Sequence, residues 1–446
     1  MLNFKVANLG KVRSANVQLT PLSILVGKNN TGKSYVATLV WSLSNLETLL
    51  QSPEARSKRP KWYRDFVDVS GPASDKTLDI DAGKCSDIIK YVNDLFKRDG
   101  SSFLSHIFAH PGFQATSVAI ENAGFVPFRV RASTVNEQAR GTTEREELHI
   151  RFVDVADNPL LRVHFPLQYW RESPFFGDMI FEELVYNIIS GFAESFARVT
   201  YIPAARTGLM LALSSLVTER FSVKDQSKSL DLPVPLVSFL QSIADPRAGY
   251  RSKSTSKLSS WLQDNIIGGS IKQDKKSGNS PFKYRPHGRE LELPLHATSS
   301  MITELAPYLL SLNSEVKGRH FILEEPEAHL HLEAQRNMAR AISRLLSAGA
   351  QVTLTTHSDT FMQQINNLMS LYAHPKKKAL MQKFGYESVD LLNPADVSAY
   401  EFSESDGLTD VRRLENTPEG FVVSSLNETL LSLARETLAI REKTRA

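Results

Sequence analysis

Eight consecutive residues near the N-terminus could bind the phosphate chain of a nucleotide. They fit the pattern G-x-x-x-x-G-K-[ST], with an apolar run before it and a helical pattern after it, which is the context that the motif requires. They are Gly27, Lys28, Asn29, Asn30, Thr31, Gly32, Lys33 and Ser34. The glycines let backbone N–H groups converge on a β-phosphate, Lys33 can reach the β- and γ-phosphates, and the Ser34 hydroxyl can bind Mg²⁺. The motif predicts ATP and Mg²⁺ as cofactors; a glycine-rich turn without a ligand is the alternative.

Two adjacent carboxylates could complete such a site. Residues 320–324 are typical of a buried strand, and Glu324 and Glu325 stand at its C-terminal end, where open α/β sheets bind their ligands. Glu324 is in position to hold Mg²⁺, directly or through water. Glu325 can polarise the attacking water as a general base. The alternative is that both side chains only cap the following helix.

A histidine ends the next strand pattern. Residues 351–356 read as a strand, and His357 follows it, about thirty residues after the carboxylates. We expect its imidazole to contact and sense the γ-phosphate, so that Lys33, Glu325 and His357 form the catalytic set. A cluster between the two strands is interpreted as a loop and helix cap rather than a metal site: Glu327, His329 and His331.

These residues need a sheet whose strands end at one edge, and the hydrophobic patterns predict one. Residues 2–26 contain two or three short strands, of which Leu22–Val26 is apolar like a buried central strand. Helical spacing of apolar residues predicts a helix from Ser34 to about Leu50. From Leu291 onward strand and helix patterns alternate, which implies parallel strands covered by helices. Strands are expected at 320–324 and 351–356, and helices at 299–312, 331–347 and 358–372.

The segment between these two parts is an insertion with its own pattern. Residues 51–75 predict an exposed loop or short helix. Residues 113–166 are β-rich, and Pro127 favours an edge position for the strand near it. The strands expected here are Phe125–Val130, Leu148–Phe152 and Leu161–Phe165, followed by a packed helix over 178–197 that includes Phe192 and Phe196. A strand at 199–203, helical segments to about 266 and a hairpin over 268–288 come next.

The order of these motifs resembles the ABC-type ATPase heads. Within them it is similar to the OLD family (overcoming lysogenization defect) and its relatives in bacterial anti-phage systems such as Gabija, Septu and PARIS. The resemblance rests on the P-loop, the long insertion, Leu323–His331 and Thr355–Ser358, and it covers about 1–50 and 195–446. It implies an α/β head of mixed and parallel sheet with flanking helices, an inserted β-rich segment and a helical subdomain. The segments expected are 1–175, 176–290 and 291–446.

In the family that the sequence resembles, two heads sandwich two nucleotides, and a serine-bearing signature helix completes each partner's P-loop. The matching segment is His296–Leu305, with Ser299 and Ser300, although the glycine pair of the LSGGQ pattern is missing. Ser299 can equally N-cap a helix, and the two interpretations are compatible. The resemblance therefore implies a homodimer or higher homo-oligomer.

Three further cations gain an interpretation from the same resemblance. Lys11 and Arg13 could contact the nucleotide, as basic residues do in SMC-type heads, or they are solvated charges. Arg206 ends the segment Tyr201–Arg206 at a strand end, where it could face phosphate or the partner.

The C-terminal part lacks the TOPRIM nuclease that OLD and Gabija-type proteins carry. No Asp-x-Asp follows His357, and Asp406 and Asp410 belong to a polar hairpin. The patterns instead predict strands over 397–402 and 409–414, and a helix over 425–442, which complete the sheet or dock a partner. A separate effector polypeptide, a nuclease or a toxin, is therefore expected.

Composition limits the remaining possibilities. The chain has 446 residues, a net charge of +3 and one cysteine, Cys85, which fits a reducing compartment and excludes an internal disulfide framework. It shows no signal peptide pattern and no run of about 18 apolar residues, so we expect a soluble cytoplasmic protein without a membrane partner. Three basic segments, two of which contain aromatic residues, could bind nucleic acid or be solvated loops. They are Lys58–Arg64, Lys272–Arg289 and Lys376–Lys378.

The function expected from all this is ATP hydrolysis by a head-to-head dimer that regulates an associated effector, plausible in anti-phage defence. Two alternatives stay open. One is a sensor or scaffold with slow turnover that sequesters a partner protein. The other is a nucleic-acid-binding ATPase of the DNA-repair type, which the lack of a coiled-coil pattern disfavours.

Overall fold

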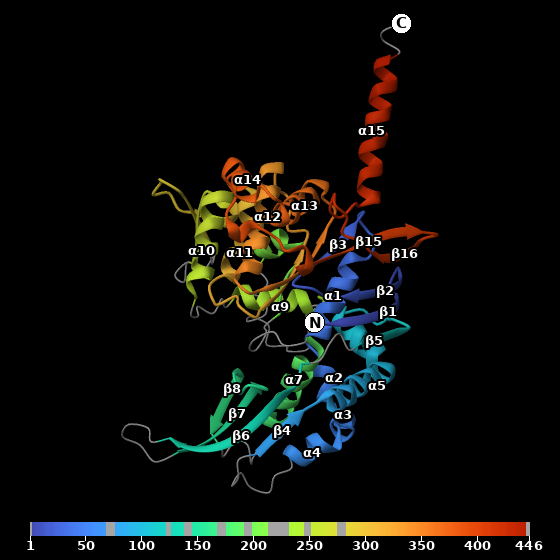
Figure 1. Cartoon of the computed structure of the whole chain (residues 1–446), viewed down its shortest axis with the longest axis vertical. Coiled ribbons are helices and arrows are strands. Elements are labelled where there is room, and N and C mark those ends of the chain that lie inside the picture. The colour runs from blue at the N-terminus through green and yellow to red at the C-terminus, as the bar shows by residue number, and fades with distance from the viewer. Residues whose placement is uncertain are drawn as a thin grey trace.

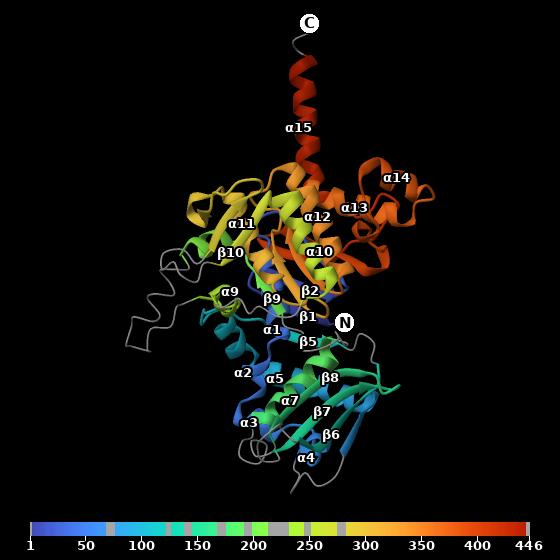
Figure 2. The same ribbon diagram turned by 90° about the vertical axis from the view of Figure 1, so that its left-hand side faces the viewer.

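A nine-stranded sheet with helices on both faces organises the computed structural model (Figures 1 and 2). The structure describes residues 2–67, 76–121, 126–137, 145–166, 175–190, 199–212, 232–244, 251–273 and 282–442. The strand order is β5-β1-β2-β16-β15-β3-β14-β13-β9, so the sheet takes strands from the N-terminal, middle and C-terminal parts of the chain. The fold class is α/β with a mixed sheet, which confirms the prediction.

Five neighbouring strands of this sheet run parallel, of which β15 (Val397–Ser405) is described below with the C-terminal strands. The other four are β3 (Leu22–Gly27), β14 (Gln351–Thr356), β13 (His320–Glu324) and β9 (Val199–Ile202). Every residue of β3 and β13 is buried, because helices cover both faces of this part of the sheet. Parallel neighbours end at the same edge, so the segments after β3, β13 and β14 are brought together there.

The covering helices agree with the expected pattern, except that the first is shorter. Helix α1 (Lys33–Leu43) packs with Leu25 in one core cluster. The opposite cluster contains Ile24 and residues of α11 (Ser300–Ser311), α12 (Leu332–Ser347) and α13 (Asp359–Ala373). The predicted continuation of the first helix to Leu50 is a separate turn of helix, α2 (Glu47–Leu50).

The C-terminal strands complete the sheet. Strand β15 (Val397–Ser405) pairs in parallel with β3, and β16 (Leu408–Arg413) joins it to β2. The other strands on this side are β1 (Asn3–Leu9), β2 (Val12–Gln18) and β5 (Ser117–Glu121). Helix α15 (Ser424–Glu442) points away from the sheet (Figures 1 and 2), and its residues 431–441 are exposed.

A second, four-stranded antiparallel sheet lies at the far end of the molecule (Figure 1). The expected edge position of the strand near Pro127 is wrong. Strand β6 starts at Phe128, so the proline precedes the ladder and β6 lies between β4 and β7. Phe125, Phe192 and Phe196 lie outside the described residues. The sheet contains β4 (Lys76–Ile80), β6 (Phe128–Glu137), β7 (Arg145–Asp154) and β8 (Pro159–Pro166), with α3 (Pro53–Ser57), α4 (Lys61–Val67), α5 (Ala82–Ile107) and α7 (Phe175–Ser190) beside it.

The expected hairpin over 268–288 is present in its described parts. It consists of β10 (Gly269–Gln273) and β11 (Phe282–Pro286), and β12 (Leu293–Pro294) pairs with β11. A π-helical turn at Gln263–Ile267, which continues α10 (Lys253–Leu262), contacts β10, and the other described α-helices are α9 (Val234–Ala244) and α14 (Lys377–Phe384). Among the described residues, no helix is long and apolar enough to span a membrane.

Candidate nucleotide site

The loop Gly27–Ser34 joins the end of β3 to the start of α1, as the motif requires. A Cβ atom at residue 27 would lie 2.5 Å from the carbonyl oxygen of Phe402, so only glycine fits beside β15. Gly32 has φ 84° and a Cβ there would lie 2.6 Å from Val12 Cγ2. These close contacts, with the positive φ of Gly32, explain why glycine stands at both positions of the motif.

Lys33 lies inside this loop. Its Nζ donates to the carbonyl oxygens of Gly27, at 2.8 Å, and of Lys28, at 2.7 Å. Burial lowers the pKa of Lys33, while the nearby negative charges of Glu325, Glu327 and Glu324 oppose that effect. The ammonium group is thus held between the phosphate-loop backbone and the carboxylates that follow β13.

Glu324 is the last residue of β13 and its side chain is buried. One carboxylate oxygen, Oε2, accepts a hydrogen bond from the N–H of Ala204 at 3.1 Å. The other, Oε1, is buried and has no hydrogen-bond partner among the described residues. An unsatisfied carboxylate oxygen and the exposed Ser34 hydroxyl are hard oxygen ligands of the type that Mg²⁺ binds. Glu324 and Ser34 therefore fit the predicted metal.

Glu325 turns out of the strand in an unusual conformation. Its φ is 43°, rare for a residue with a side chain, and its N–H donates to both the carbonyl and the Oγ1 of Thr355 on β14, at 3.0 and 3.1 Å. Its Oε1 lies 3.3 Å from His357 Nδ1. The interaction with His357 lowers the pKa of Glu325, and the same interaction raises the pKa of His357. The sequence predicted both residues but not this contact between them.

Glu327 fixes the segment that carries His357. It is buried, and its Oε1 accepts from Thr356 Oγ1 at 2.5 Å and from the His357 N–H at 3.1 Å. Burial raises the pKa of Glu327. These bonds could not be predicted from the sequence, because they depend on β13 and β14 being neighbours.

The interpretation of this region as a loop and helix cap is supported. His331 is the N-cap of α12, and its Nδ1 accepts from the N–H of Ala334 at 3.4 Å. The described residues contain no group of three or more histidine, cysteine, aspartate or glutamate side chains that could hold a metal ion.

Arg206 does not occupy the expected position at a phosphate or partner surface. Its side chain is fully buried. Nη1 donates to the carbonyl oxygens of Pro203, at 2.9 Å, and Glu324, at 2.7 Å, and Nη2 donates to that of Glu325 at 2.8 Å. It also forms an ion pair with Glu304 of α11. The strand-end position was the available signal, but the sequence could not show that the guanidinium points inward.

Ser299 and Ser300 lie at the start of α11, and both are exposed. Ser299 occupies the N-cap position, as one interpretation required, yet its side chain makes no capping hydrogen bond. The surface at this helix end therefore presents two serines and backbone N–H groups.

Lys11 and Arg13 form ion pairs with the hairpin of β15 and β16. Lys11 Nζ lies 2.8 Å from Glu404 Oε2, and Arg13 Nη1 lies 3.0 Å from Asp410 Oδ2. A Cβ at residue 32 would lie 3.6 Å from Lys11 Cγ, so Lys11 flanks the phosphate loop. In the structure, each cation thus has a carboxylate partner.

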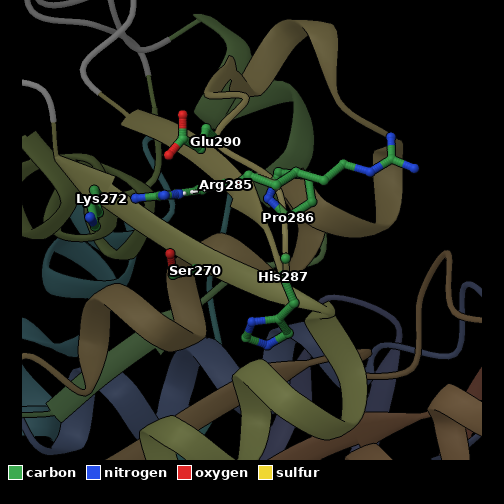
Figure 3. A pocket seen from close by; sticks show the side chains of 8 residues that line it. Ser270, Lys272, Arg285, Pro286, His287 and Glu290 are labelled. Atoms are coloured by element: carbon green, nitrogen blue, oxygen red, sulfur yellow. Dashed lines mark hydrogen bonds between the residues drawn. The ribbon is translucent and has the colours of Figure 1, made fainter.

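The three basic segments lie apart from one another. Helices α4 and α14 lie at opposite ends of the molecule (Figures 1 and 2). The hairpin β10–β11 borders its own pocket of about 330 Å³, where Figure 3 shows Lys272, Arg285 and Glu290. His287 at its rim lies 3.1 Å from Asp264 Oδ1. The pocket is local and separate from the phosphate loop.

Comparison with protein families points to the same chemistry. A family model described as an AAA ATPase domain matches residues 224–362. The matched part contains Glu324, Glu325 and His357, covers less than half of the chain and does not include the phosphate loop. No curated protein matches the sequence.

Solved structures that the chain resembles include SMC heads. The SMC head domain from Thermotoga maritima has 11% identity and a TM-score of 0.30, with 93% of this chain and 99% of that chain covered. The Smc head domain derived from Pyrococcus furiosus, bound to the C-terminal domain of ScpA, has 12% identity and a TM-score of 0.34, with 100% and 99% covered. A SmcHead bound to the C-winged helix domain of ScpA has 11% identity and a TM-score of 0.37, with 93% and 97% covered. Because these identities and TM-scores are low, the likeness to these structures carries no argument about the site. By the family match, residues 224–362 are similar to an ATPase domain.

Proposed function

We propose that this chain binds ATP with Mg²⁺ and hydrolyses it at the edge formed by β3, β13 and β14. The observation that carries the proposal is the meeting of three distant segments. The pairing of Val26 with Thr356, and of Thr355 with Glu324, aligns the ends of the three strands. Burial lowers the pKa of Lys33 and the negative charges of Glu325, Glu327 and Glu324 oppose this effect, which supports the proximity of Lys33 to these carboxylates.

Each residue then has a chemical task. Lys33 and the loop N–H groups bind the β- and γ-phosphates, and Glu324 with Ser34 would hold Mg²⁺, which neutralises charge on the phosphates when bound. Glu325 accepts the proton of the attacking water, and its lowered pKa keeps it ionised at neutral pH. His357, raised in pKa by Glu325, can donate to the γ-phosphate.

The proposal extends to a head-to-head dimer that regulates a separate effector, such as a nuclease or toxin, in anti-phage defence. Its support is the resemblance to OLD-type heads together with the two exposed serines at the start of α11. The alternative function is a sensor that hydrolyses ATP slowly while it sequesters a partner protein. It would use the same site and differ only in the rate of hydrolysis.

The direct test compares Lys33→Ala with a control, Lys97→Ala. Lys97 lies on α5, and its side chain is 77% exposed. Lys33→Ala should abolish ATP binding and hydrolysis, because the charge at the β- and γ-phosphates is lost, whereas Lys97→Ala should match the parent chain. Tight ATP binding with normal hydrolysis in Lys33→Ala would reject the site. Steady-state rates with and without nucleic acid or phage protein then separate a cycling regulator from a slow sensor.

A further inference from the structure

A buried ion pair connects the proposed partner-facing helix to the carboxylate edge. Arg206 follows β9, Glu304 belongs to α11, and the side chains of both are 0% exposed. Burying two charges is costly unless both are well bonded. The pair therefore needs an explanation beyond the packing of β9 against α11.

On one side, the guanidinium holds the backbone of both proposed site carboxylates. It donates to the carbonyl oxygens of Glu324 and Glu325, at 2.7 and 2.8 Å. Those two peptide units set the direction in which each carboxylate leaves the strand, and Glu325 has the strained φ of 43°. A planar group with donors in fixed directions suits this task, and a lysine ammonium does not.

On the other side, Glu304 is fixed to α11 close to its N-terminus. The helix starts at Ser300, so Glu304 lies about one turn further on. Its carboxylate also accepts from the hydroxyl of Thr207, the residue after Arg206. A displacement of the Ser300 end is thereby transmitted to Glu304, then to Arg206 and to the two carbonyl groups.

We propose that Arg206 is a positioning residue that couples the position of α11 to Glu324 and Glu325 of the same chain. The inference rests on the proposed function, in which the partner's nucleotide binds at the Ser300 end of α11. Occupancy of one nucleotide site in the dimer then adjusts the general base of the other. Turnover should respond cooperatively to ATP through this pair.

The test uses Glu304→Gln and Arg206→Lys in the full chain, with Arg59→Lys as the matched control. Arg59 is also a buried arginine, and it forms an ion pair with Asp178 of α7, beside the four-stranded sheet. Both site variants should keep their ATP affinity, measured with a fluorescent ATP analogue. Their kcat should fall by about 10²-fold, since small misplacement of reacting groups has effects of this size. The Hill coefficient for ATP should fall toward one, and Arg59→Lys should change neither quantity.

The double variant Arg206→Met/Glu304→Leu separates positioning from stability. It removes both buried charges and keeps apolar volume, so it should unfold at a higher temperature than Glu304→Gln. Because methionine cannot donate to the carbonyl groups, its kcat should stay low. Recovery of kcat in the double variant would overturn the coupling, and so would parental kcat and cooperativity in Glu304→Gln. In either case, ATP hydrolysis by the parent chain would leave the proposed function intact. Absence of hydrolysis by the parent chain would remove both.

Discussion

At the scale of single residues, two adjacent glutamates acquire different properties from their surroundings. Glu324 ends β13 and is buried, with one oxygen bonded to the N–H of Ala204. Glu325 leaves the strand through a left-handed conformation and reaches His357. Glu324 is therefore suited to hold a cation, whereas Glu325 can meet a water at the γ-phosphate.

Replacing each glutamate by glutamine should separate these tasks. Glu325→Gln keeps shape and hydrogen bonding but removes the base, so kcat should fall by about 10²–10⁴-fold with ATP affinity preserved. Glu324→Gln should weaken Mg²⁺-dependent nucleotide binding as well. Single-turnover rates and ATP titrations at several Mg²⁺ concentrations measure both effects. Equal, mild losses in the two variants would show that the tasks are confused or that neither carboxylate is the base.

A buried histidine beneath the site makes stability depend on pH. His320 is at the start of β13, its Nε2 lies 2.9 Å from Thr353 Oγ1, and burial lowers its pKa to about 4. At pH values between the ordinary pKa of histidine and about 4, His320 binds a proton in the unfolded chain but stays neutral in the folded chain. Folding stability is therefore lost as the pH falls through that window, by up to about 3 kcal/mol.

Urea unfolding of the parent chain and His320→Asn across pH 7.5 to 4.5 tests this. The parent should be the more stable at neutral pH, and its advantage should shrink by about 3 kcal/mol or slightly less at the acid end. The exposed His106, changed to asparagine, serves as the control. A difference between parent and His320→Asn that stays constant over this pH range would contradict the explanation.

The sequence predicted those site residues that belong to a local motif. Lys33, with its loop, needs only nearby residues to be recognised. The inward position of Arg206 and the bonds of Glu327 could not be predicted, because their partners are backbone groups of other segments. These are the carbonyl groups of Glu324 and Glu325 for Arg206, and the His357 N–H for Glu327. Burial and direction of a side chain follow from packing, which periodicity does not report.

At the scale of elements, apolar runs predicted the strands that carry the site. β3, β13 and β14 are buried along almost their whole length, so most of their residues are apolar or small whichever face they meet. The edge position predicted from Pro127 is wrong because the proline lies one residue before β6 and so takes no part in its hydrogen-bond ladder. Helix α5 was missed, although its 26 residues form the longest described helix, since its polar residues obscure the apolar stripe.

The start of α11 is the element whose proposed task is easiest to isolate. Ser300 is exposed there, so Ser300→Arg should leave the fold and nucleotide binding at the P-loop unchanged. Hydrolysis should fall strongly, because a bulky side chain blocks the partner's phosphate from the helix end. Circular dichroism, ATP binding and turnover measure these three properties.

Mixing gives the control for Ser300→Arg. In a mixed dimer with Lys33→Ala, one of the two composite sites has an intact P-loop and an intact Ser300, so partial activity should return in trans. Full activity of Ser300→Arg alone would show that the start of α11 takes no part in the nucleotide site. A rate per chain that does not depend on protein concentration would count against the shared site.

At the scale of the whole molecule, the central sheet is closed by contacts between distant parts of the chain. β15, near the C-terminus, separates β3 from β16, and β16 contacts β2. The insertion with the four-stranded sheet lies at one end of the molecule, and α15 extends from the other (Figure 1). The nucleotide edge between them is completed only when both ends of the chain have folded onto the same sheet.

The whole-molecule prediction concerns ATP-dependent dimerisation. If two heads close over two nucleotides, a chain that binds ATP but hydrolyses it slowly should remain closed. Glu325→Gln should therefore run as a larger species on a sizing column with light-scattering detection, only when ATP and Mg²⁺ are both present. The same chain carrying Ser300→Arg should stay monomeric under these conditions while still binding ATP, because the contact in trans is blocked. A Glu325→Gln chain that binds ATP and stays monomeric at all concentrations would show that the site works within one chain, and the proposed coupling of α11 to a partner's nucleotide would fall with it.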